Sequence, residues 1–457
     1  MALKLQDGSR VGVVGGGPAG SLFSYFLLTL AQRMDVRLQV DIYEPRDFTR
    51  PGPGGCNMCG GIVSESLIQA LAVEGITLPG RVVQRGLDSY VLHTDDNEVR
   101  IETPLHEMRI AAIHRGGGPQ GERRRRWGGL DGYLLGLAQE LGARVVRSRV
   151  RDAGREKERP TLQADAARQA YDLVVGATGV NSSRWRLLEQ LGLRSRPPRT
   201  TKAFITEIDL GEELISRHFG TSIHLFLLSV PGLDCAAVIP KGEFLTVCLL
   251  GERIDETLVQ RFFDSAAVQR CFAALPGPQA QACRCKPNIN VREAERPYAD
   301  RVVLIGDCGA TRLYKDGIGA AYRAAKCAAR TAVLEGVSAA AFARHYMPLY
   351  RSIVRDNRYG SVMFGSLHWI KRMGPLVGGV LQMAGKEQTR PGAARDMSIV
   401  LWDTFTGSAP YRDIVLRALR PRFIRRFAWE TLTSMRSRER GAAVKESSDH
   451  GIGTIGS

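Results

Sequence analysis

Short apolar runs and a segment with helical periodicity alternate at the start of the chain. Residues 11–14 and 38–43 are short apolar runs, and residues 21–32 between them carry apolar side chains at the density of a helix. Short continuous apolar runs are typical of strands buried in a parallel sheet. The order strand, helix, strand predicts a βαβ unit, and therefore an α/β protein with a Rossmann-like sheet.

Two later apolar runs have the same character. Residues 171–179 end in small side chains, and residues 301–307 end at Asp307. Small residues at the carboxyl end of a parallel strand leave room in the crevice where α/β sheets bind ligands. We therefore expect both runs to join the N-terminal unit. The predicted Rossmann-like domain is discontinuous and consists of residues 8–80, 104–200 and 286–340.

The remaining segments follow other patterns. Alternating residues flank a turn signal at residues 95–97, and a second alternating stretch turns at Lys241 and the following glycine. Both patterns predict hairpins. We expect an inserted, mostly antiparallel β substrate domain formed by residues 81–103 and 201–285. Strand signals then disappear, so the rest is predicted as a helical C-terminal region (residues 341–435) and a disordered tail (residues 436–457).

A glycine-rich turn joins the first predicted strand to the first predicted helix. Gly15, Gly17 and Gly20 occupy the glycine positions of a G-x-G-x-x-G motif. Such glycines permit a tight turn and let a diphosphate approach the backbone, while the helix N-terminus offers free N–H groups. Glu44 ends the next predicted strand, at about the spacing of a carboxylate that binds a ribose hydroxyl. Together these features predict dinucleotide binding.

Composition and charge narrow the class of protein. The 457 residues are 44% hydrophobic and 24% charged, which is ordinary for a globular protein, and the net charge of +16 predicts an anionic partner. Without zinc-finger, RNP or helix-turn-helix patterns, we do not expect nucleic acid to be that partner. The first strand begins near residue 10 and the nine cysteines lack a disulfide-framework spacing. Both observations favour a cytoplasmic protein.

Cys56 and Cys59 lie in a glycine-rich loop that spans residues 51–61. Three interpretations remain open: the loop only lines a ligand, a thiol acts in redox or acid–base chemistry beside a cofactor, or the cysteines hold a metal or iron–sulfur cluster. The last interpretation would also need Cys283 and Cys285, whose C-x-C spacing is poor for such a site. We therefore expect no metal site.

Two basic segments could bind anions. The run of four arginines at residues 123–126 is either a solvated cluster or a phosphate clamp. Residues 412–435 combine an apolar helical face with arginines and Trp429, a pattern typical of a helix on an anionic bilayer. Alternatively, this helix packs on the domain with its arginines in water, and Pro421 would interrupt it. The apolar face comprises Leu416, Leu419, Phe423 and Phe427, and the arginines are Arg417, Arg420, Arg422, Arg425 and Arg426. Peripheral contact with the inner face of the membrane thus stays open.

Three of these features, taken in order, resemble a known superfamily. The N-terminal glycine motif, the strand end at residues 172–179, and Gly306-Asp307 with residues 317–320 resemble the FAD-dependent oxidoreductases with a p-hydroxybenzoate-hydroxylase-like fold. Within that superfamily, residues 59–62 and 238–243 resemble the geranylgeranyl reductase family. The resemblance implies FAD as cofactor, with NAD(P)H as a candidate electron donor. It also implies a reductase that delivers hydride from reduced flavin to a C=C bond or quinone-like group of a small hydrophobic, isoprenoid or lipid-like substrate.

The resemblance also implies roles for individual residues. Those expected at the pyrophosphate and adenosine ribose are Gly15, Gly17, Pro18, Ala19, Gly20 and Glu44. Those expected at the flavin and ribityl chain are Cys59, Gly60, Ile62, Arg126, Asp307, Gly317, Gly319 and Ala320. Proton delivery to the substrate needs an acid within hydrogen-bond reach, and the candidates are Cys59, Cys56 and Tyr314.

Two other functions fit the same sequence. One is an NAD(P)H-dependent monooxygenase that hydroxylates an aromatic or polyketide substrate. The sequence shows no second G-x-G-x-x-G motif. This does not exclude the monooxygenase, because hydroxylases of this superfamily also lack a separate nicotinamide domain. The other is a flavin-holding redox sensor or membrane-docked scaffold, in which Cys56 and Cys59 switch between thiols and a disulfide.

Overall fold

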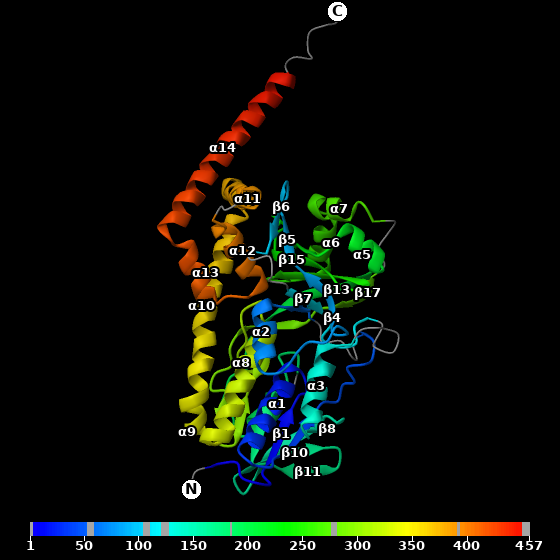
Figure 1. Ribbon diagram of the computed structural model, residues 1–457, viewed down its shortest axis with the longest axis vertical. Coiled ribbons are helices and arrows are strands. Elements are labelled where there is room, and N and C mark those ends of the chain that lie inside the picture. Colours follow the sequence, from blue (N-terminus) through cyan, green and yellow to red (C-terminus); the bar gives the residue numbers. More distant parts are fainter. Residues whose placement is uncertain are drawn as a thin grey trace, which may run out of the picture.

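A computed structural model describes residues 3–52, 59–103, 110–119, 128–182, 185–275, 281–390 and 394–449. Cys56 and Arg126 lie outside these residues. The described chain is a mixed α/β structure with a parallel sheet, a large mostly antiparallel sheet and a helical C-terminal region (Figure 1). The predicted fold class is therefore confirmed.

The parallel sheet has the order β19-β20-β12-β1-β2-β8, with β19 as an antiparallel edge strand. Its strands are β1 (Arg10–Val14), β2 (Gln39–Tyr43), β8 (Arg144–Val146), β12 (Leu173–Gly176), β19 (Tyr298–Ala299) and β20 (Val302–Leu304). Side chains alternate across it: Val11 and Val13 pack in the same core as helices α1 (Pro18–Arg33), α3 (Leu130–Glu140) and α8 (Gly317–Arg330). The opposite face, including Val174, packs on a three-stranded sheet and α4 (Trp185–Gln190). That sheet consists of β9 (Val150–Glu156), β10 (Arg159–Ala164) and β11 (Ala167–Ala170).

The large sheet has the order β17-β13-β16-β15-β14-β5-β6, with β18 also paired to β13. The bounds are β5 (Ser89–His93), β6 (Glu98–Glu102), β13 (Arg199–Asp209), β14 (Ser222–Phe226), β15 (Leu233–Pro240), β16 (Phe244–Gly251), β17 (Gln281–Cys285) and β18 (Asn288–Arg292). Both predicted hairpins, β5–β6 and β15–β16, are present. The pair β5–β14 is parallel and joins segments that are distant along the chain. Helices α5 (Glu212–His218), α6 (Glu256–Asp264) and α7 (Ala266–Phe272) pack on one face.

A small sheet connects the two parts. It has the order β3-β7-β4, with β3 (Ile62–Val63), β4 (Val83–Leu87) and β7 (Ile110–Ile113), and helix α2 (Glu65–Val73) follows β3. Ile113 packs in the core of the parallel sheet, whereas its neighbour Ala112 packs in the core of the large sheet. The small sheet therefore fixes the position of residues 59–61, which directly precede β3, between the two cores.

Helices form the C-terminal region. They are α9 (Ala339–Ala341), α10 (Met347–Ile370), α11 (Gly374–Thr389), α12 (Asp396–Thr406), α13 (Tyr411–Ala418) and α14 (Pro421–Asp449), with short π-helical turns at Thr331–Glu335 and Phe342–Tyr346. Pro421 begins α14, where its missing N–H needs no helical partner, so the helix is interrupted at Pro421 as expected and the segment forms two helices. We predicted disorder over residues 436–457, but α14 continues to Asp449 through a stretch rich in the helix-forming residues Arg, Glu and Ala.

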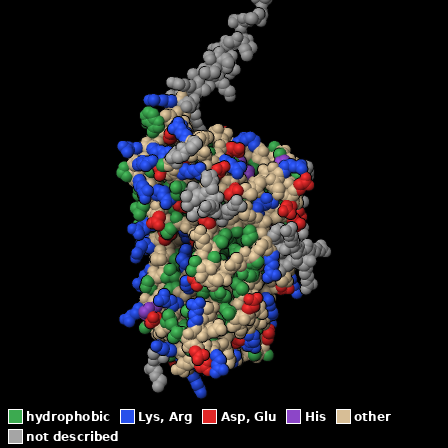
Figure 2. All heavy atoms as spheres, in the orientation of Figure 1, with side chains coloured by type: hydrophobic (Ala, Val, Ile, Leu, Met, Phe, Trp, Pro, Cys, Tyr) green, Lys and Arg blue, Asp and Glu red, His purple; other side chains and the backbone are tan. Residues whose placement is uncertain are grey.

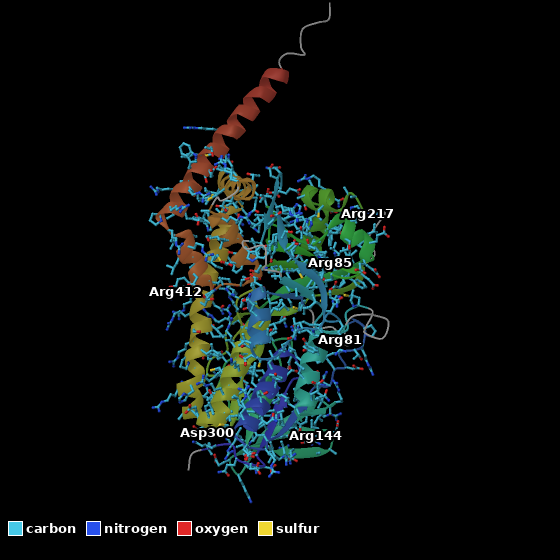
Figure 3. The ribbon with its side chains drawn as sticks, in the orientation of Figure 1. Arg81, Arg85, Arg144, Arg217, Asp300 and Arg412 are labelled. Atoms are coloured by element: carbon cyan, nitrogen blue, oxygen red, sulfur yellow. The ribbon has the colours of Figure 1, made fainter. Side chains whose placement is uncertain are left out.

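The outer side of this helical region is basic. Figure 2 shows Lys and Arg side chains gathered along the edge over α10, α13 and α14, and Arg412 projects outward from α13 (Figure 3). None of the described helices combines the length and the apolar content that crossing a bilayer requires.

Candidate functional site

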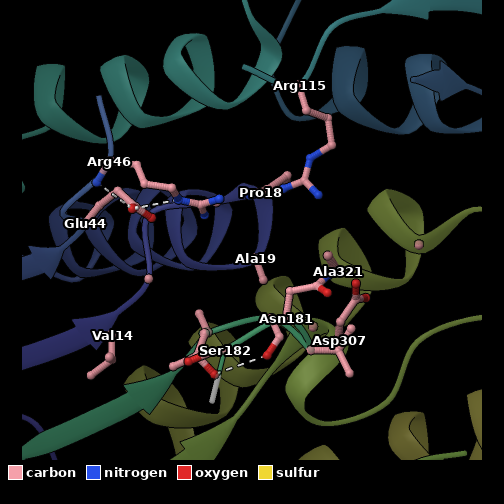
Figure 4. Close-up of a pocket in the computed structure, with 18 of the residues that line it drawn as sticks. Val14, Pro18, Ala19, Glu44, Arg46, Arg115, Asn181, Ser182, Asp307 and Ala321 are labelled. Carbon is pink, nitrogen blue, oxygen red and sulfur yellow. Dashed lines mark hydrogen bonds and ion pairs between the residues drawn. The ribbon is translucent and has the colours of Figure 1, made fainter. Parts of the chain in front are cut away.

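A cavity of about 510 Å³ opens at the carboxyl ends of β1, β2, β12 and β20 (Figure 4). This edge of a parallel sheet is where α/β proteins bind ligands. Nine of the residues predicted at the cofactor line the cavity: Gly15, Gly17, Pro18, Ala19, Glu44, Cys59, Ile62, Asp307 and Gly317. Residues that line it without having been predicted include Tyr43, Arg46, Arg115, Arg149, Asn181 and Ser182.

The glycine turn is shaped by close backbone contacts. Gly15 has φ +111°, and a Cβ placed on it would lie 2.3 Å from the carbonyl oxygen of Ala177. A Cβ on Gly20 would lie 1.9 Å from the carbonyl oxygen of Gly15, so Gly20 serves packing rather than contact with a ligand. Gly17 is the N-cap of α1, with no side-chain cap and no acidic residue in the first turn. The N-terminus of α1 thus presents N–H groups and positive potential to the cavity.

Glu44 is fixed beside this turn. Its side chain is buried, and its Oε2 accepts a hydrogen bond from the Gly16 N–H at 3.0 Å. Its Oε1 accepts from the Arg46 N–H at 3.0 Å and from Arg46 Nε at 3.3 Å. These contacts hold the carboxylate against the cavity at the end of β2, where the sequence placed a ribose ligand (Figure 4).

A partly buried guanidinium beside the α1 N-terminus was not predicted. Arg115 follows β7, and its Nε and Nη2 donate to Asp131 Oδ1 and Oδ2 at 3.0 and 2.7 Å. A Cβ on Gly17 would lie 3.3 Å from Arg115 Nη2. Burial alone would lower the pKa of Arg115, but the adjacent Asp131 carboxylate outweighs it and raises the pKa, so the guanidinium stays charged. The predicted Arg126 lies outside the described residues, and Arg115 puts positive charge at the cavity.

The far wall of the cavity comes from β20 and α8. A Cβ on Gly306, which has φ +66°, would lie 2.7 Å from Ala19 Cβ, so the two halves of the wall meet closely. Burial raises the pKa of the Asp307 carboxyl that lines this wall. Gly319 does not line the cavity, because its N–H donates to Asp316 Oδ1 at 3.1 Å and caps α8. Ala320 is also fully buried, and Ile318 and Ala321 line the cavity instead.

Residues 59 and 60 lie between the cavity and the large sheet. Cys59 lines the cavity, and its Sγ accepts a hydrogen bond from the Gly61 N–H at 3.3 Å. On the other side, a Cβ on Gly60 would lie 3.2 Å from Cys248 Sγ. Tyr314 does not line the cavity: its ring packs edge-on against Phe364 at 5.0 Å, and burial raises the pKa of its hydroxyl.

A cluster of buried polar side chains lies next to Gly61. Lys241 Nζ donates to Glu207 Oε1 at 3.2 Å and lies 3.4 Å from His114 Nδ1. Thr246 Oγ1 donates to Glu207 Oε2 at 2.7 Å. A Cβ on Gly61 would lie 3.0 Å from Lys241 Nζ, so the ammonium group touches the loop. Lys241 was predicted only as part of a turn, because its partners are more than 30 residues away along the chain.

The sheet order, the glycine turn and the added large sheet give the chain a p-hydroxybenzoate-hydroxylase-like fold. A geranylgeranyl bacteriochlorophyll reductase-like protein from Thermoplasma acidophilum matches with a TM-score of 0.65 and 14% identity, covering 91% of this chain and 99% of that one. A p-nitrophenol 4-monooxygenase from Pseudomonas putida matches with a TM-score of 0.57 and 15% identity, covering 88% and 98%. A halogenase in complex with FAD matches with a TM-score of 0.58 and 13% identity, covering 97% and 94%.

In sequence, the chain is similar to a kynurenine 3-monooxygenase of Salinispora arenicola. The two are 27% identical over an alignment of 331 positions, which covers 65% of this chain and 66% of that protein, just under two thirds of its length. No protein-family model matches the chain.

Proposed function

We propose that the protein is an FAD-dependent oxidoreductase, in which FAD supplies hydride transfer from its reduced form to a C=C bond or quinone-like group of a hydrophobic substrate. The observation that carries the proposal is the uncapped N-terminus of α1, which faces a cavity shared with Arg115 and Glu44. This donor set suits a dinucleotide, since it offers N–H groups and a cation to a diphosphate and a carboxylate to a ribose.

Different residues of the chain would bind different parts of FAD. The first turn of α1 and Arg115 would hold the diphosphate, and Glu44 would accept hydrogen bonds from the ribose hydroxyls. Asp307, partly buried on the far wall, would bind the ribityl hydroxyls. Cys59 and Ile62 would border the ring and exclude water from it, and Cys59 remains the candidate proton donor within the described residues.

The monooxygenase remains a second candidate. The fold similarity to a reductase-like protein supports the reductase, whereas the sequence similarity to a kynurenine 3-monooxygenase supports hydroxylation with NAD(P)H and oxygen. Both candidates use the same cofactor cavity. The thiol-switch alternative depends on Cys56, which lies outside the described residues, and it stays a prediction.

An absorption spectrum of the purified protein, with the released cofactor identified, tests the proposal first. We expect flavin bands, FAD on release, and bleaching when NADH or NADPH is added without oxygen. The reduced protein is then offered isoprenoid, quinone and aromatic substrates. A saturated or quinol product formed without oxygen supports the reductase, and oxygen uptake that matches a hydroxylated product supports the monooxygenase. A protein that takes up no FAD even on incubation contradicts both.

We also propose that the protein collects its substrate at an anionic membrane surface. Six of the eleven strongly exposed large apolar side chains among the described residues lie between Leu416 and Met435. They are Leu416, Leu419, Ile424, Trp429, Leu432 and Met435, and exposed Arg412, Arg420, Arg422, Arg425 and Arg436 accompany them. Exposed apolar side chains among arginines are typical of helices that lie on anionic lipid.

The structure corrects the expected lipid-facing side. Phe423 is buried and Phe427 partly buried against the core, so these two residues hold α14 on the protein. Arg417 pairs with Asp403, and Arg426 pairs with Glu387. These two phenylalanines and two arginines are therefore left out of the proposed membrane surface, although the sequence pattern had grouped them with it.

A further inference from the structure

Two histidines and a cysteine from three separate elements meet at one end of the large sheet. His93 ends β5, His224 lies on β14 and Cys271 lies on α7. One donor atom from each of them lies within 4.8 Å of the other two. In Figure 1, β5 and α7 lie toward the top of the view and β1 toward the bottom, so the cluster is remote from the cavity at β1.

The donor atoms converge on one point. His93 Nε2 lies 2.8 Å from His224 Nδ1, and Cys271 Sγ lies 3.5 Å from the same Nδ1. Metal bonds of about 2.0–2.3 Å in a tetrahedral site separate the donors by roughly 3.3–3.6 Å. The sulfur–nitrogen distance already has this value. The two imidazoles need to part by about half an ångström, which exchanges their mutual hydrogen bond for two metal bonds.

Neighbouring groups orient the two rings. Glu98 Oε2 lies 3.0 Å from His93 Nδ1, so the carboxylate directs Nε2 toward His224. A carboxylate behind a histidine is the usual outer partner of a metal-binding imidazole. Phe226 stacks on His93 at 4.5 Å, and Phe219 packs edge-on against His224 at 5.3 Å. Both rings are therefore held by packing as well as by polar contacts.

The same surroundings keep an imidazole lone pair available. The hydrogen bond between His93 Nε2 and His224 Nδ1 requires one of these two nitrogens to accept it, so at least one lone pair faces the cluster. Cys271 and His224 are only partly buried, which leaves a route from solvent to the cluster. Glu98 on β6 offsets the positive charges of Arg100 and Arg270 nearby.

We propose that His93, His224 and Cys271 bind a divalent transition-metal cation, with Zn²⁺ the best match, and that solvent completes the fourth position. Two imidazoles and a thiolate select such a cation over Mg²⁺ or Ca²⁺, which prefer oxygen. The Cys271 thiol releases its proton to solvent as the bond forms. The cation fastens α7 to strands β5 and β14. This inference is independent of the proposed flavin chemistry, and it uses none of the cysteines that the sequence pattern had considered for a metal.

The test begins with the full-length protein passed over a chelating resin and then titrated with Zn²⁺. Bound metal is measured by mass spectrometry after removal of free Zn²⁺, and alkylation of each cysteine by iodoacetamide is followed on peptides. We expect wild type to retain one Zn²⁺ per chain more than Cys271→Ser. Zn²⁺ should slow alkylation of Cys271 at least tenfold and leave Cys327, a partly buried thiol on α8, unchanged.

Glu98→Gln is the second variant. It keeps all three metal ligands, and we expect Zn²⁺ affinity to fall by about tenfold to a hundredfold, as for other outer-shell carboxylates. Circular dichroism establishes that each variant is folded. If Cys271→Ser fails to fold, two other measurements test the proposal. They are the protection of Cys271 from alkylation by Zn²⁺ in wild type and the Zn²⁺ affinity of Glu98→Gln. Equal zinc in wild type and Cys271→Ser, or equal protection of Cys271 and Cys327, would mean a hydrogen-bonded cluster only and overturn the proposal.

Discussion

Arg115 and Asp131 form a partly buried two-point ion pair that places the Arg115 guanidinium beside the N-terminus of α1. The two bonds are 3.0 and 2.7 Å long, the Asp131 side chain is fully buried, and that of Arg115 is 20% exposed. The pair connects the end of β7 to the first turn of α3, so the small sheet and the parallel sheet both determine where the guanidinium lies. A cation held in this way needs no rearrangement to receive a diphosphate.

Arg115→Met is expected to weaken FAD binding by about tenfold to a hundredfold, because a hydrogen bond to a charged group contributes about 1.5–3 kcal/mol. It also leaves the Asp131 carboxylate buried without a partner, so the free energy of unfolding should fall by about 3–5 kcal/mol. Fluorescence titration with FAD and urea unfolding measure the two effects. Arg37→Met is the matched control, since Arg37 pairs with Asp7 in an exposed position. Equal FAD affinity in wild type and Arg115→Met would remove Arg115 from the site.

Gly20→Ala should prevent the N-terminal unit from forming its native turn. The added Cβ would lie 1.9 Å from a backbone oxygen that has no room to move, so we expect loss of FAD binding and a much lower melting temperature. Gly136→Ala in α3 is the control, because its Cβ would meet no atom within 4 Å. That variant should be more stable than wild type by up to about 1 kcal/mol, since alanine favours the helix. Thermal unfolding distinguishes the two, and equal melting temperatures would contradict the close contact.

The parts of the fold and of the site that could be predicted are formed by residues that lie close together along the chain. Gly15, Gly17 and Glu44 lie in one βαβ unit whose strand order follows from the apolar pattern, so the pattern could place them together. Arg115 and Lys241 could not be predicted as site residues. Each is positioned by a partner on another element, and nothing in the local pattern of either segment indicates that partner.

The sequence also did not reveal which residues of α8 face the cavity. The glycines at the start of α8 could be recognised, but Asp316 caps the helix through the Gly319 N–H. This capping turns Ile318 and Ala321 to the cavity in place of the two expected residues between them. Which residues of a helix face a cavity depends on the cap and the packing, and the motif alone does not contain that information.

Asp41→Asn should make the protein less stable near neutral pH and leave it unchanged in acid. Burial raises the pKa of Asp41, but hydrogen bonds from Arg144 and Tyr171 outweigh burial and hold the pKa below its ordinary value. A lowered carboxyl pKa stabilises the fold above the unfolded value of about 3.9, and this stabilisation is lost as the pH falls through the folded value.

We therefore expect the free energy of unfolding of Asp41→Asn to be lower by about 1–3 kcal/mol near pH 7. The difference should shrink steadily below about pH 4. Urea unfolding across this range measures it. Asp7→Asn removes an exposed pair with Arg37 and should change stability little at any pH. A difference between wild type and Asp41→Asn that stays constant into acid would show that packing, not charge, is responsible.

Leu419→Glu combined with Trp429→Glu should abolish binding to vesicles that contain anionic phosphatidylglycerol. The two side chains are 60% and 61% exposed, so the change removes apolar surface and adds repulsion without disturbing the core. Val73→Glu, at an 84% exposed position on α2, is the matched control and should bind as wild type does. Substitution is preferable to truncation at Tyr411, because that residue and Phe423 are buried.

Arg420→Gln together with Arg425→Gln tests the electrostatic part of the same surface. Each arginine near an anionic membrane contributes about 1 kcal/mol, so the pair should weaken vesicle binding by roughly thirtyfold at low salt. High salt should reduce the difference, because it screens exposed charges. Co-sedimentation with anionic and with neutral phosphatidylcholine vesicles measures both. Binding to neutral vesicles that equals binding to anionic ones would contradict an electrostatic surface.

Lys241 and Glu207 should behave as one unit in a double-mutant cycle. Their side chains are 1% and 6% exposed and 3.2 Å apart, so Lys241→Met leaves a buried carboxylate unpaired and should cost about 3–5 kcal/mol of unfolding free energy. Lys241→Met combined with Glu207→Gln removes that unpaired charge and should cost less than the two single changes added together.

Because Lys241 Nζ touches Gly61, Lys241→Met should also weaken FAD binding through the loop that carries Cys59, whereas the double variant should recover part of it. Lys326→Met, which breaks a half-exposed pair with Glu74, is the control and should change stability by less than about 1 kcal/mol. Additive costs would mean that Lys241 and Glu207 act independently, and that the loop is positioned by its backbone alone.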